Sequence, residues 1–308
     1  MKNFINISDH SSNDLRAIID EAKIRKLKRK NSNKSSPDED KPFEGKSMAM
    51  IFEKPSTRTR MSFDIAVKQL GGSSIVLNPD GIHYGKGDET LKDTAKVLTE
   101  YVDIVMLRTS SHKNLEEFGK HLNIPIINGL SDLGHPCQIM SDILTYEESN
   151  GTIEGKTVAW LGDGNNNMSN SLIEAAGKFN FNLRIACPKK YSPNKKILSW
   201  AKKNKASLIV TTKPDEAVQN SDCVMTDKWV SMNDKVNKKS KKKILKPFQV
   251  NKKLMSKANS DAIFMHCLPV GRGEEVTDEI IDGKQSVVWR QALNRVHAQK
   301  SIIKWCLD

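Results

Sequence analysis

Short apolar runs alternate with stretches of helical periodicity from about residue 47 onward. In the first half, four such runs predict buried strands: Ser47 to Phe52, Ser74 to Leu77, Asp103 to Leu107 and Ile124 to Ile127. Apolar residues at helical spacing between residues 61 and 70 stop at Gly71-Gly72, which is typical of a helix end. A second helical face recurs over residues 91–101.

The second half repeats this alternation. Five further strands are predicted: Thr157 to Leu161, Leu183 to Ala186, Leu208 to Thr211, Cys223 to Thr226 and Ala262 to Cys267. Helical patterns separate most of them, including one from Met168 to Phe179. Strands that alternate with helices predict parallel sheets covered on both faces. We therefore expect an α/β protein with two doubly wound parallel-sheet domains and an active site in the cleft between them.

The domain boundary is expected near Asn150-Gly151, after a helix from about Pro136 to Glu148. This divides the chain into domains over residues 1–150 and 151–290. The last helix, about residues 291–308, has no strand after it, so we expect it to pack back on the first domain. Residues 26–46 and the lysine-rich residues 232–247 are expected as surface loops.

No apolar run approaches the roughly 18 residues that a membrane span requires. The first residues, Met1 to Ile5, lack the apolar core of a secretory signal. Five scattered cysteines among 308 residues are typical of free thiols in a reducing compartment. These features predict a cytoplasmic protein.

The formal net charge of +12 raises the alternative of a nucleic-acid-binding protein. Lysine and arginine crowd into residues 23–30 and 235–253, however, and no aromatic residues are interleaved for base stacking. We interpret both runs as solvated loops, and we expect no nucleic-acid partner. The charge can still attract anionic metabolites over long range.

The segment from Pro55 to Arg60 (Pro-Ser-Thr-Arg-Thr-Arg) follows a predicted strand and opens a predicted helix. Free backbone N–H groups and the helix dipole favour an anion at such a position. Three hydroxyls and two guanidinium groups add donors suited to phosphate. An ordinary N-cap is the alternative, but a cap requires one hydroxyl rather than three.

Two further positions end predicted strands. Arg108 lies where ligands bind in open α/β sheets, although a surface ion pair would also explain an arginine there. Gly162-Asp163-Gly164 lies between a strand and a helix, but without a third glycine it is weak evidence for a dinucleotide-binding oxidoreductase. A plain strand-to-helix turn is an equal alternative.

Three strings in order along the chain resemble motifs of one known family. They are Phe52 to Arg60, His135-Pro136-Cys137-Gln138, and His266-Cys267-Leu268-Pro269 with its continuation through Arg272 to Val276. Together the strings resemble the aspartate/ornithine carbamoyltransferase family over essentially the whole chain, and Cys267 is the marker of its ornithine branch. The resemblance implies transfer of the carbamoyl group of carbamoyl phosphate to the δ-amine of L-ornithine, giving L-citrulline and phosphate. It implies no cofactor and no metal.

The family's site residues carry over to matching positions. For carbamoyl phosphate the resemblance implies Ser56, Thr57, Arg58, Thr59, His83, Arg108, His135, Gln138, Cys267, Leu268 and Arg295. For ornithine it implies Asn167, with Asn166 one register away, Asp227, Ser231, Met232 and Cys267. The residues expected to be catalytic are Arg108, His135, Asp227 and Cys267.

The family also implies a homotrimer, in which His83 reaches carbamoyl phosphate from a neighbouring subunit. Two departures from the family pattern stand out: Asn233 replaces a glycine, and Trp289 to Leu293 is less acidic than usual. N-acetylornithine, putrescine and aspartate are the rival acceptors. Arginine biosynthesis is the expected pathway, although the same residues would serve degradation.

Overall fold

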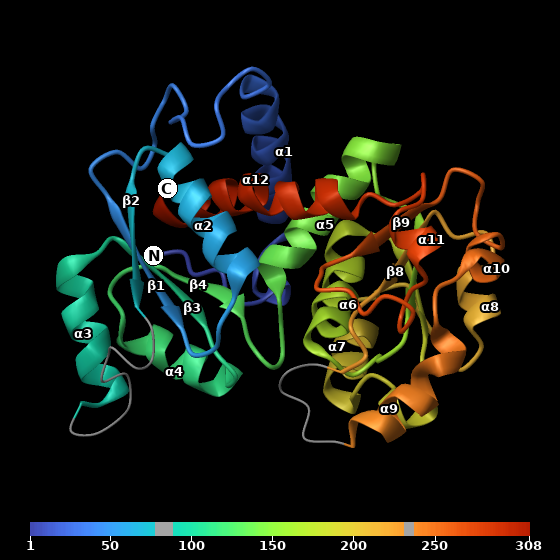
Figure 1. Ribbon diagram of the computed structural model, residues 1–308. Helices are drawn as coiled ribbons and strands as arrows, with labels where there is room; N and C mark the ends of the chain where they lie inside the picture. Colours follow the sequence, from blue (N-terminus) through green and yellow to red (C-terminus); the bar gives the residue numbers. More distant parts are fainter. Residues whose placement is uncertain (78–88, 231–236) are drawn as a thin grey trace. The chain divides into compact units, whose positions relative to one another are not determined.

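The computed structural model describes residues 1–77, 89–230 and 237–308. The predictions for His83, Ser231, Met232 and Asn233 lie outside these residues. The chain forms two compact units (Figure 1). Unit 1 contains Met1–Leu144 and Leu293–Asp308, and unit 2 contains Thr145–Ala292.

Unit 1 is built on a four-stranded parallel sheet of order β2-β1-β3-β4. Its strands are β1 (Ser47–Phe52), β2 (Ser73–Leu77), β3 (Ile104–Arg108) and β4 (Ile126–Leu130). Its helices are α1 (Ser12–Lys28), α2 (Thr57–Gln69), α3 (Leu91–Tyr101), α4 (His112–His121), most of α5 (Pro136–Asn150) and most of α12 (Val288–Leu307). A short 3-10 helix, η1 (Ile7–Asp9), precedes them.

Alternate residues of each strand point to opposite faces of this sheet. Ala49, Ile51, Val105 and Leu107 form one buried cluster with Leu98 of α3 and Phe118 of α4. Helices α2 and α12 lie on the opposite side of the sheet (Figure 1). The sheet is thus covered on both faces, as expected for parallel strands.

Unit 2 is built on a five-stranded parallel sheet of order β7-β6-β5-β8-β9. Its strands are β5 (Thr157–Leu161), β6 (Asn182–Ala186), β7 (Leu208–Thr211), β8 (Cys223–Thr226) and β9 (Ile263–His266). Its helices are α6 (Asn167–Phe179), α7 (Lys195–Lys203), α8 (Pro214–Val218), α9 (Lys238–Leu245), α10 (Lys252–Met255) and α11 (Asp278–Ile281), with 3-10 helices η3 (Lys189–Tyr191) and η4 (Lys246–Phe248). Its main core joins β5, β8 and β9 to α8, α10 and α11.

The predicted α/β class with two parallel sheets is confirmed, and all nine predicted strands are present. The two predicted basic loops were wrong in part. Residues 23–28 complete α1, and residues 238–245 form α9. Both segments also bury one cation each, Arg25 at 5% exposure and Lys241 at 5%, because acidic partners from distant segments meet them.

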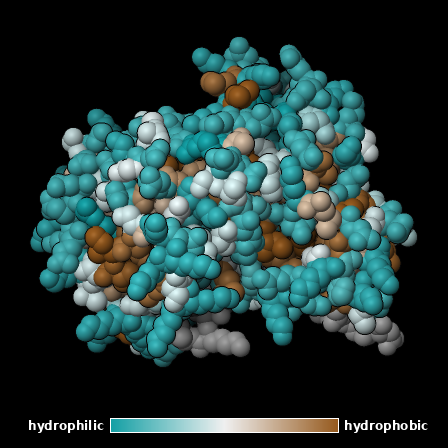
Figure 2. All heavy atoms as spheres, turned by 180° about the vertical axis from the view of Figure 1, so that it is seen from behind, coloured by the Kyte–Doolittle hydropathy of each residue, from teal (hydrophilic) through white to brown (hydrophobic). Residues whose placement is uncertain are grey.

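One face of the molecule is mainly hydrophilic, with a few areas of hydrophobic residues (Figure 2). No helix within the described ranges is long and apolar enough to cross a membrane.

Candidate active site

The N-terminus of α2 in unit 1 forms the first part of the candidate site. Ser56 is the N-cap, with extended backbone, and its hydroxyl accepts a hydrogen bond from Thr59 N at 3.4 Å. Ser56 alone therefore provides the N-cap of α2, and Thr57 and Thr59 are not needed for capping. The other N–H groups of the first turn, with the positive end of the helix dipole, remain suited to an anion.

Two arginines converge on Thr59, which is buried at 1% exposure. Arg108 Nη1, at the end of β3, donates to Thr59 Oγ1 at 3.0 Å. Arg295 Nη2, from α12, donates to the same oxygen at 2.9 Å. Each guanidinium carries five N–H donors in a planar fork, so one hydroxyl occupies only part of each. The structure thus brings the predicted residues Arg108 and Arg295 together at the N-terminus of α2. Arg295 and Thr59 are 236 residues apart along the chain.

Gln138 joins the same group from α5. Its Oε1 accepts from Arg295 Nη1 at 2.9 Å, and its Nε2 donates to Asp142 Oδ1 at 2.8 Å. The two bonds fix which end of the amide points toward Arg295. Asp142, which the motif did not include, therefore orients a predicted site residue.

His135 is 4% exposed and directly precedes Pro136, the first residue of α5. Burial lowers the pKa of this imidazole well below its usual value, and the charges of Arg295 and Arg108 lower it further. The ring is therefore neutral at physiological pH and can donate a hydrogen bond from one nitrogen without carrying charge.

Unit 2 places Asp227 and Cys267 side by side. They directly follow the paired residues Thr226 and His266 at the ends of the neighbouring parallel strands β8 and β9. Cys267 Sγ lies 3.2 Å from Asp227 Oδ1, which also accepts from Lys228 N at 2.7 Å. Both side chains are only partly buried, so a thiol and a carboxylate are presented together at one sheet edge.

His266 and Glu275 were identified in the sequence only as parts of a motif, and the structure adds them to the site. Leu268 N donates to His266 Nδ1 at 2.9 Å, so the ring proton lies on Nε2. Nε2 is 3.3 Å from Glu275 Oε1, and both side chains are fully buried. Nδ1 is therefore engaged by a backbone donor, whereas Nε2 makes no hydrogen bond to the described residues despite its closeness to Glu275. Asp227, His266 and Cys267 have potential metal-ligating atoms within 4.8 Å of one another.

Leu268, the last carbamoyl-phosphate position of this motif, is partly buried and has φ of 59°. This left-handed backbone turns the chain after β9 and directs the Leu268 N–H to His266.

The loop between β5 and α6 contains residues for which the sequence left alternatives open. Asn166 is the N-cap of α6 and accepts from Ser169 N at 2.8 Å, so it has a structural role, while Asn167 begins the helix. Gly164 packs so closely that an added Cβ would lie 2.9 Å from Cys187 Sγ and 3.0 Å from Tyr191 O. Packing within unit 2 thus accounts for this glycine, without a dinucleotide.

Two family models match the chain. The model described as aspartate/ornithine carbamoyltransferase, carbamoyl-P binding domain, matches residues 2–148. The model described as aspartate/ornithine carbamoyltransferase, Asp/Orn binding domain, matches residues 154–306.

Individual proteins agree with these models. The chain is 50% identical to an ornithine carbamoyltransferase of Brucella ovis over 308 residues, covering 100% of this chain and 96% of the relative. It is 50% identical to one of Nitrobacter winogradskyi over 306 residues, covering 99% and 97%. Among solved structures, ornithine carbamoyltransferase from Pyrococcus furiosus is 42% identical with a TM-score of 0.92, covering 98% of this chain and 96% of that one. An anabolic ornithine carbamoyltransferase from Campylobacter jejuni is 38% identical with a TM-score of 0.90, covering 99% of both. The chain therefore belongs to the aspartate/ornithine carbamoyltransferase family.

Proposed function

We propose that the protein carries out ornithine carbamoyl transfer by direct attack of the δ-amine on carbamoyl phosphate. The convergence of Arg108 and Arg295 on Thr59, at the N-terminus of α2, is the observation that carries this proposal. Ser56, Thr57, Arg58, Thr59 and Arg295 bind the phosphate oxygens. Guanidinium forks and helix N–H groups are the donors that match such oxygens.

The carbonyl of carbamoyl phosphate is polarised by Thr59, Arg108 and His135. A neutral His135 donates to the carbonyl oxygen, and Arg108 stabilises the negative charge that grows there during attack. Groups already oriented toward a developing oxyanion supply a large part of such rate enhancements. Gln138 holds the carbamoyl amide, because its own amide is oriented by Arg295 and Asp142.

Asp227 pairs with the α-ammonium of ornithine, and Cys267 contacts the δ-amine and the carbamoyl group together with Leu268. Asn167 contributes to binding the amino acid. The δ-nitrogen attacks as the neutral amine, a C–N bond forms, and the C–O bond to phosphate breaks. The departing phosphate accepts the proton that the new nitrogen loses. The roles of His83, Ser231 and Met232 rest on the sequence resemblance alone.

Replacement of Arg58 with Ala tests the phosphate assignment. We expect citrulline formation to fall at least a hundredfold, since one oriented charge donor is worth roughly that much in such sites. Arg60→Ala, two residues along on the exposed side of α2, is the matched control. Near-normal activity of Arg58→Ala would contradict the assignment.

The choice of acceptor is tested by offering ornithine, N-acetylornithine, putrescine and aspartate to the purified protein. Ornithine carries both the α-ammonium for Asp227 and the free δ-amine, so it should give the highest kcat/KM. A preference for any of the other three would overturn the proposed contacts.

We also propose a trimer. Strand β2 is an edge of its sheet and leaves Ile75 48% exposed, while α3 leaves Val97 47% and Tyr101 74% exposed. Exposed apolar residues of this kind are typical of association surfaces when they lie together. Sedimentation equilibrium should give about three times the 34.6 kDa chain mass, and a monomer at micromolar concentration would contradict this.

The proposed setting is arginine biosynthesis in the cytoplasm. All five cysteines are free, as expected in a reducing compartment, and one similar solved structure is of an anabolic enzyme. A strain that lacks the protein should then require arginine or citrulline, and growth on ornithine alone would contradict the pathway.

A further inference from the structure

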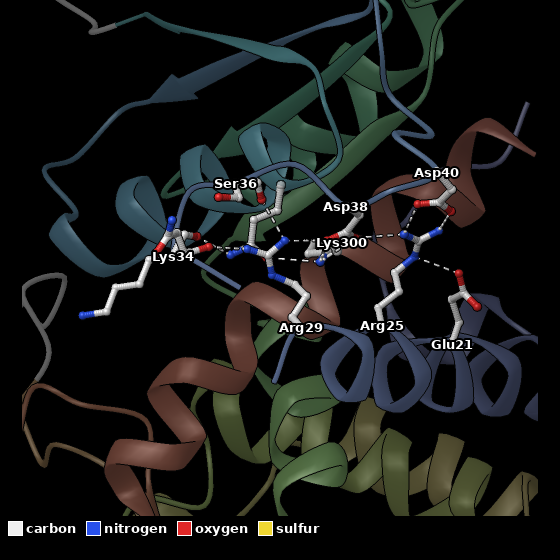
Figure 3. Close-up of polar contacts among 10 residues, drawn as sticks. Glu21, Arg25, Arg29, Lys34, Ser36, Asp38, Asp40 and Lys300 are labelled. Atoms are coloured by element: carbon white, nitrogen blue, oxygen red, sulfur yellow. Dashed lines mark hydrogen bonds and ion pairs between the residues drawn. The ribbon is translucent and has the colours of Figure 1, made fainter. Parts of the chain in front are cut away.

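A group of charges with a buried centre lies where α1, the segment after it and α12 meet in unit 1 (Figure 3). We name it the Asp38 cluster, and it consists of Glu21, Arg25, Arg29, Asp38, Asp40 and Lys300. Asp38, with its side chain 8% exposed, accepts from Arg25 at 2.9 Å, from Arg29 at 2.7 Å and from Lys300 at 2.7 Å. Arg25 additionally pairs with Asp40 at 2.6 Å and with Glu21 at 2.8 Å.

Lys300 is the member that α12 contributes, and its side chain is fully buried. Besides Asp38, its Nζ contacts Gln69 Oε1, at the C-terminal end of α2, at 3.1 Å. Burying an ammonium group costs free energy unless the group is paired and hydrogen-bonded. A buried lysine at this position therefore calls for an explanation. The proposed reaction assigns no contact to it.

Helices α2 and α12 are therefore tied together twice. Arg295 of α12 donates to Thr59 in the first turn of α2, and Lys300 of α12 donates to Gln69 in its last. The neighbour of Arg295, Asn294, also accepts from Lys26 of α1 at 2.7 Å. These contacts fix α12 along and across α2, and the guanidinium of Arg295 is fixed with it.

We propose that Lys300, through Asp38 and Gln69, is a positioning residue that sets Arg295 in the phosphate site. This inference rests on the proposed role of Arg295. It predicts that the ammonium of Lys300, which never touches substrate, controls the affinity for carbamoyl phosphate.

Opposing effects bring the pKa of the Lys300 ammonium close to neutral pH. Burial lowers the pKa of its ammonium to about 8, the bonds to Asp38 oppose this, and the charges of Arg29 and Arg25 add to it. Burial would raise the pKa of Asp38, but the bonds from Lys300, Arg29 and Arg25 hold it below its usual value. His297, also on α12, is neutral because burial lowers its pKa to about 3. The remaining charges beside Lys300 are thus permanent near neutral pH.

Deprotonation of Lys300 should weaken the binding of carbamoyl phosphate. Below pH 8 Lys300 is charged and held by the Asp38 carboxylate. Above it the ammonium loses its proton, the attraction to Asp38 weakens, and the position of α12 is less restrained. The KM for carbamoyl phosphate should therefore rise between pH 7 and pH 9, independently of the deprotonation of ornithine, which affects kcat.

Lys300→Met tests the proposal in the full-length enzyme, because methionine keeps most of the buried length and removes the charge. We expect the KM for carbamoyl phosphate to rise roughly tenfold, while kcat at saturation and the KM for ornithine change less than twofold. The dependence of this KM on pH between 7 and 9 should disappear. Lys304→Met is the matched control, since Lys304 lies one turn further along α12 in an exposed pair with Asp308.

A folded Lys300→Met enzyme with an unchanged KM for carbamoyl phosphate overturns the proposal, as does an equal change in Lys304→Met. If Lys300→Met does not fold, Gln69→Met removes the contact between Lys300 and α2, together with the bond from Gln69 Nε2 to Lys34 O at 2.6 Å. An unchanged KM in that variant overturns the proposal too. Arg295→Met distinguishes a failure of the phosphate assignment from a failure of the positioning role of Lys300. An unaltered KM in Arg295→Met contradicts the phosphate assignment itself, whereas a raised KM there with no effect at Lys300 contradicts only the positioning.

Discussion

Thr59 shows how much one hydroxyl can organise. It is buried at the start of α2, and both Arg108 and Arg295 donate to its oxygen. In the proposed reaction the same hydroxyl turns toward substrate, so it holds two cations in place until a phosphate takes over part of their donors.

Replacement of Thr59 with Val keeps the shape and removes the acceptor. Hydrogen bonds to charged groups contribute roughly 1.5–3 kcal/mol each, so we expect the free energy of unfolding to fall by about 2 kcal/mol. The KM for carbamoyl phosphate should rise with it. Urea unfolding and steady-state kinetics measure the two effects. Thr99→Val, at a half-buried hydroxyl on α3, should cost less than 1 kcal/mol, and an equal loss there would contradict the interpretation.

His297 makes stability depend on pH. Its pKa is about 3 in the folded chain and about 6.5 when unfolded, so the unfolded chain binds a proton first as pH falls. The stability it contributes is complete above pH 6.5 and declines below it, by at most about 1.4 kcal/mol per pH unit. His135 acts in the same direction. Chemical denaturation at pH 7 and pH 5 should show this loss, and His297→Gln should reduce it.

At the scale of elements, helix α9 is attached to the rest of unit 2 by a buried ion pair. Lys241 Nζ lies 2.7 Å from Asp163 Oδ2, with both side chains less than a tenth exposed, and also lies over the Tyr191 ring. Asp163 belongs to the loop between β5 and α6, three residues before Asn166. The basic helix therefore packs on the loop that leads into the proposed ornithine site.

Lys241→Met should destabilise unit 2, because removing one partner of a buried pair costs roughly 3–5 kcal/mol. The KM for ornithine should rise, while the KM for carbamoyl phosphate should not. Lys239→Met, on the exposed part of the same helix, serves as the control. Equal effects of the two substitutions would show that the lysine run acts only as a charged surface.

The elements differ in how far sequence could predict them. Strand β1 and the start of α2 followed from an apolar run and a hydroxyl-rich turn, which are local signals. The partners of Arg25, Lys241 and Lys300 could not be predicted, because a lysine run has the same composition whether solvated or paired. Asp38 is 262 residues from Lys300, and only the folded chain brings them together. The pairing of Arg108 with Arg295 at Thr59 was likewise implied by resemblance, not by spacing.

At the scale of the whole molecule, substrate binding should stabilise the two units separately. In the proposed site the phosphate of carbamoyl phosphate is bound by unit 1 residues alone, and a ligand at a hundred times its Kd adds about 2.7 kcal/mol to the stability of what it binds. Hydrogen exchange with carbamoyl phosphate alone should then protect residues 56–60 and 135–138 before residues near Asp227. Adding ornithine should extend protection to unit 2. If carbamoyl phosphate alone protected Asp227 as strongly as both substrates together, this order would be contradicted.

Helix α12 has a consequence for how the enzyme is made. Its residues from Leu293 onward belong to unit 1, but they leave the ribosome after all of unit 2. At roughly 5–20 residues per second, unit 1 waits on the order of 10 s for Arg295 and Lys300. During that interval Asp38, Arg25 and Arg29 lack their contact with Lys300, and the proposed phosphate site lacks Arg295. A nascent chain can therefore hold a nearly complete first unit that is not yet able to bind its substrate fully, so competence arrives only when synthesis has passed the second unit.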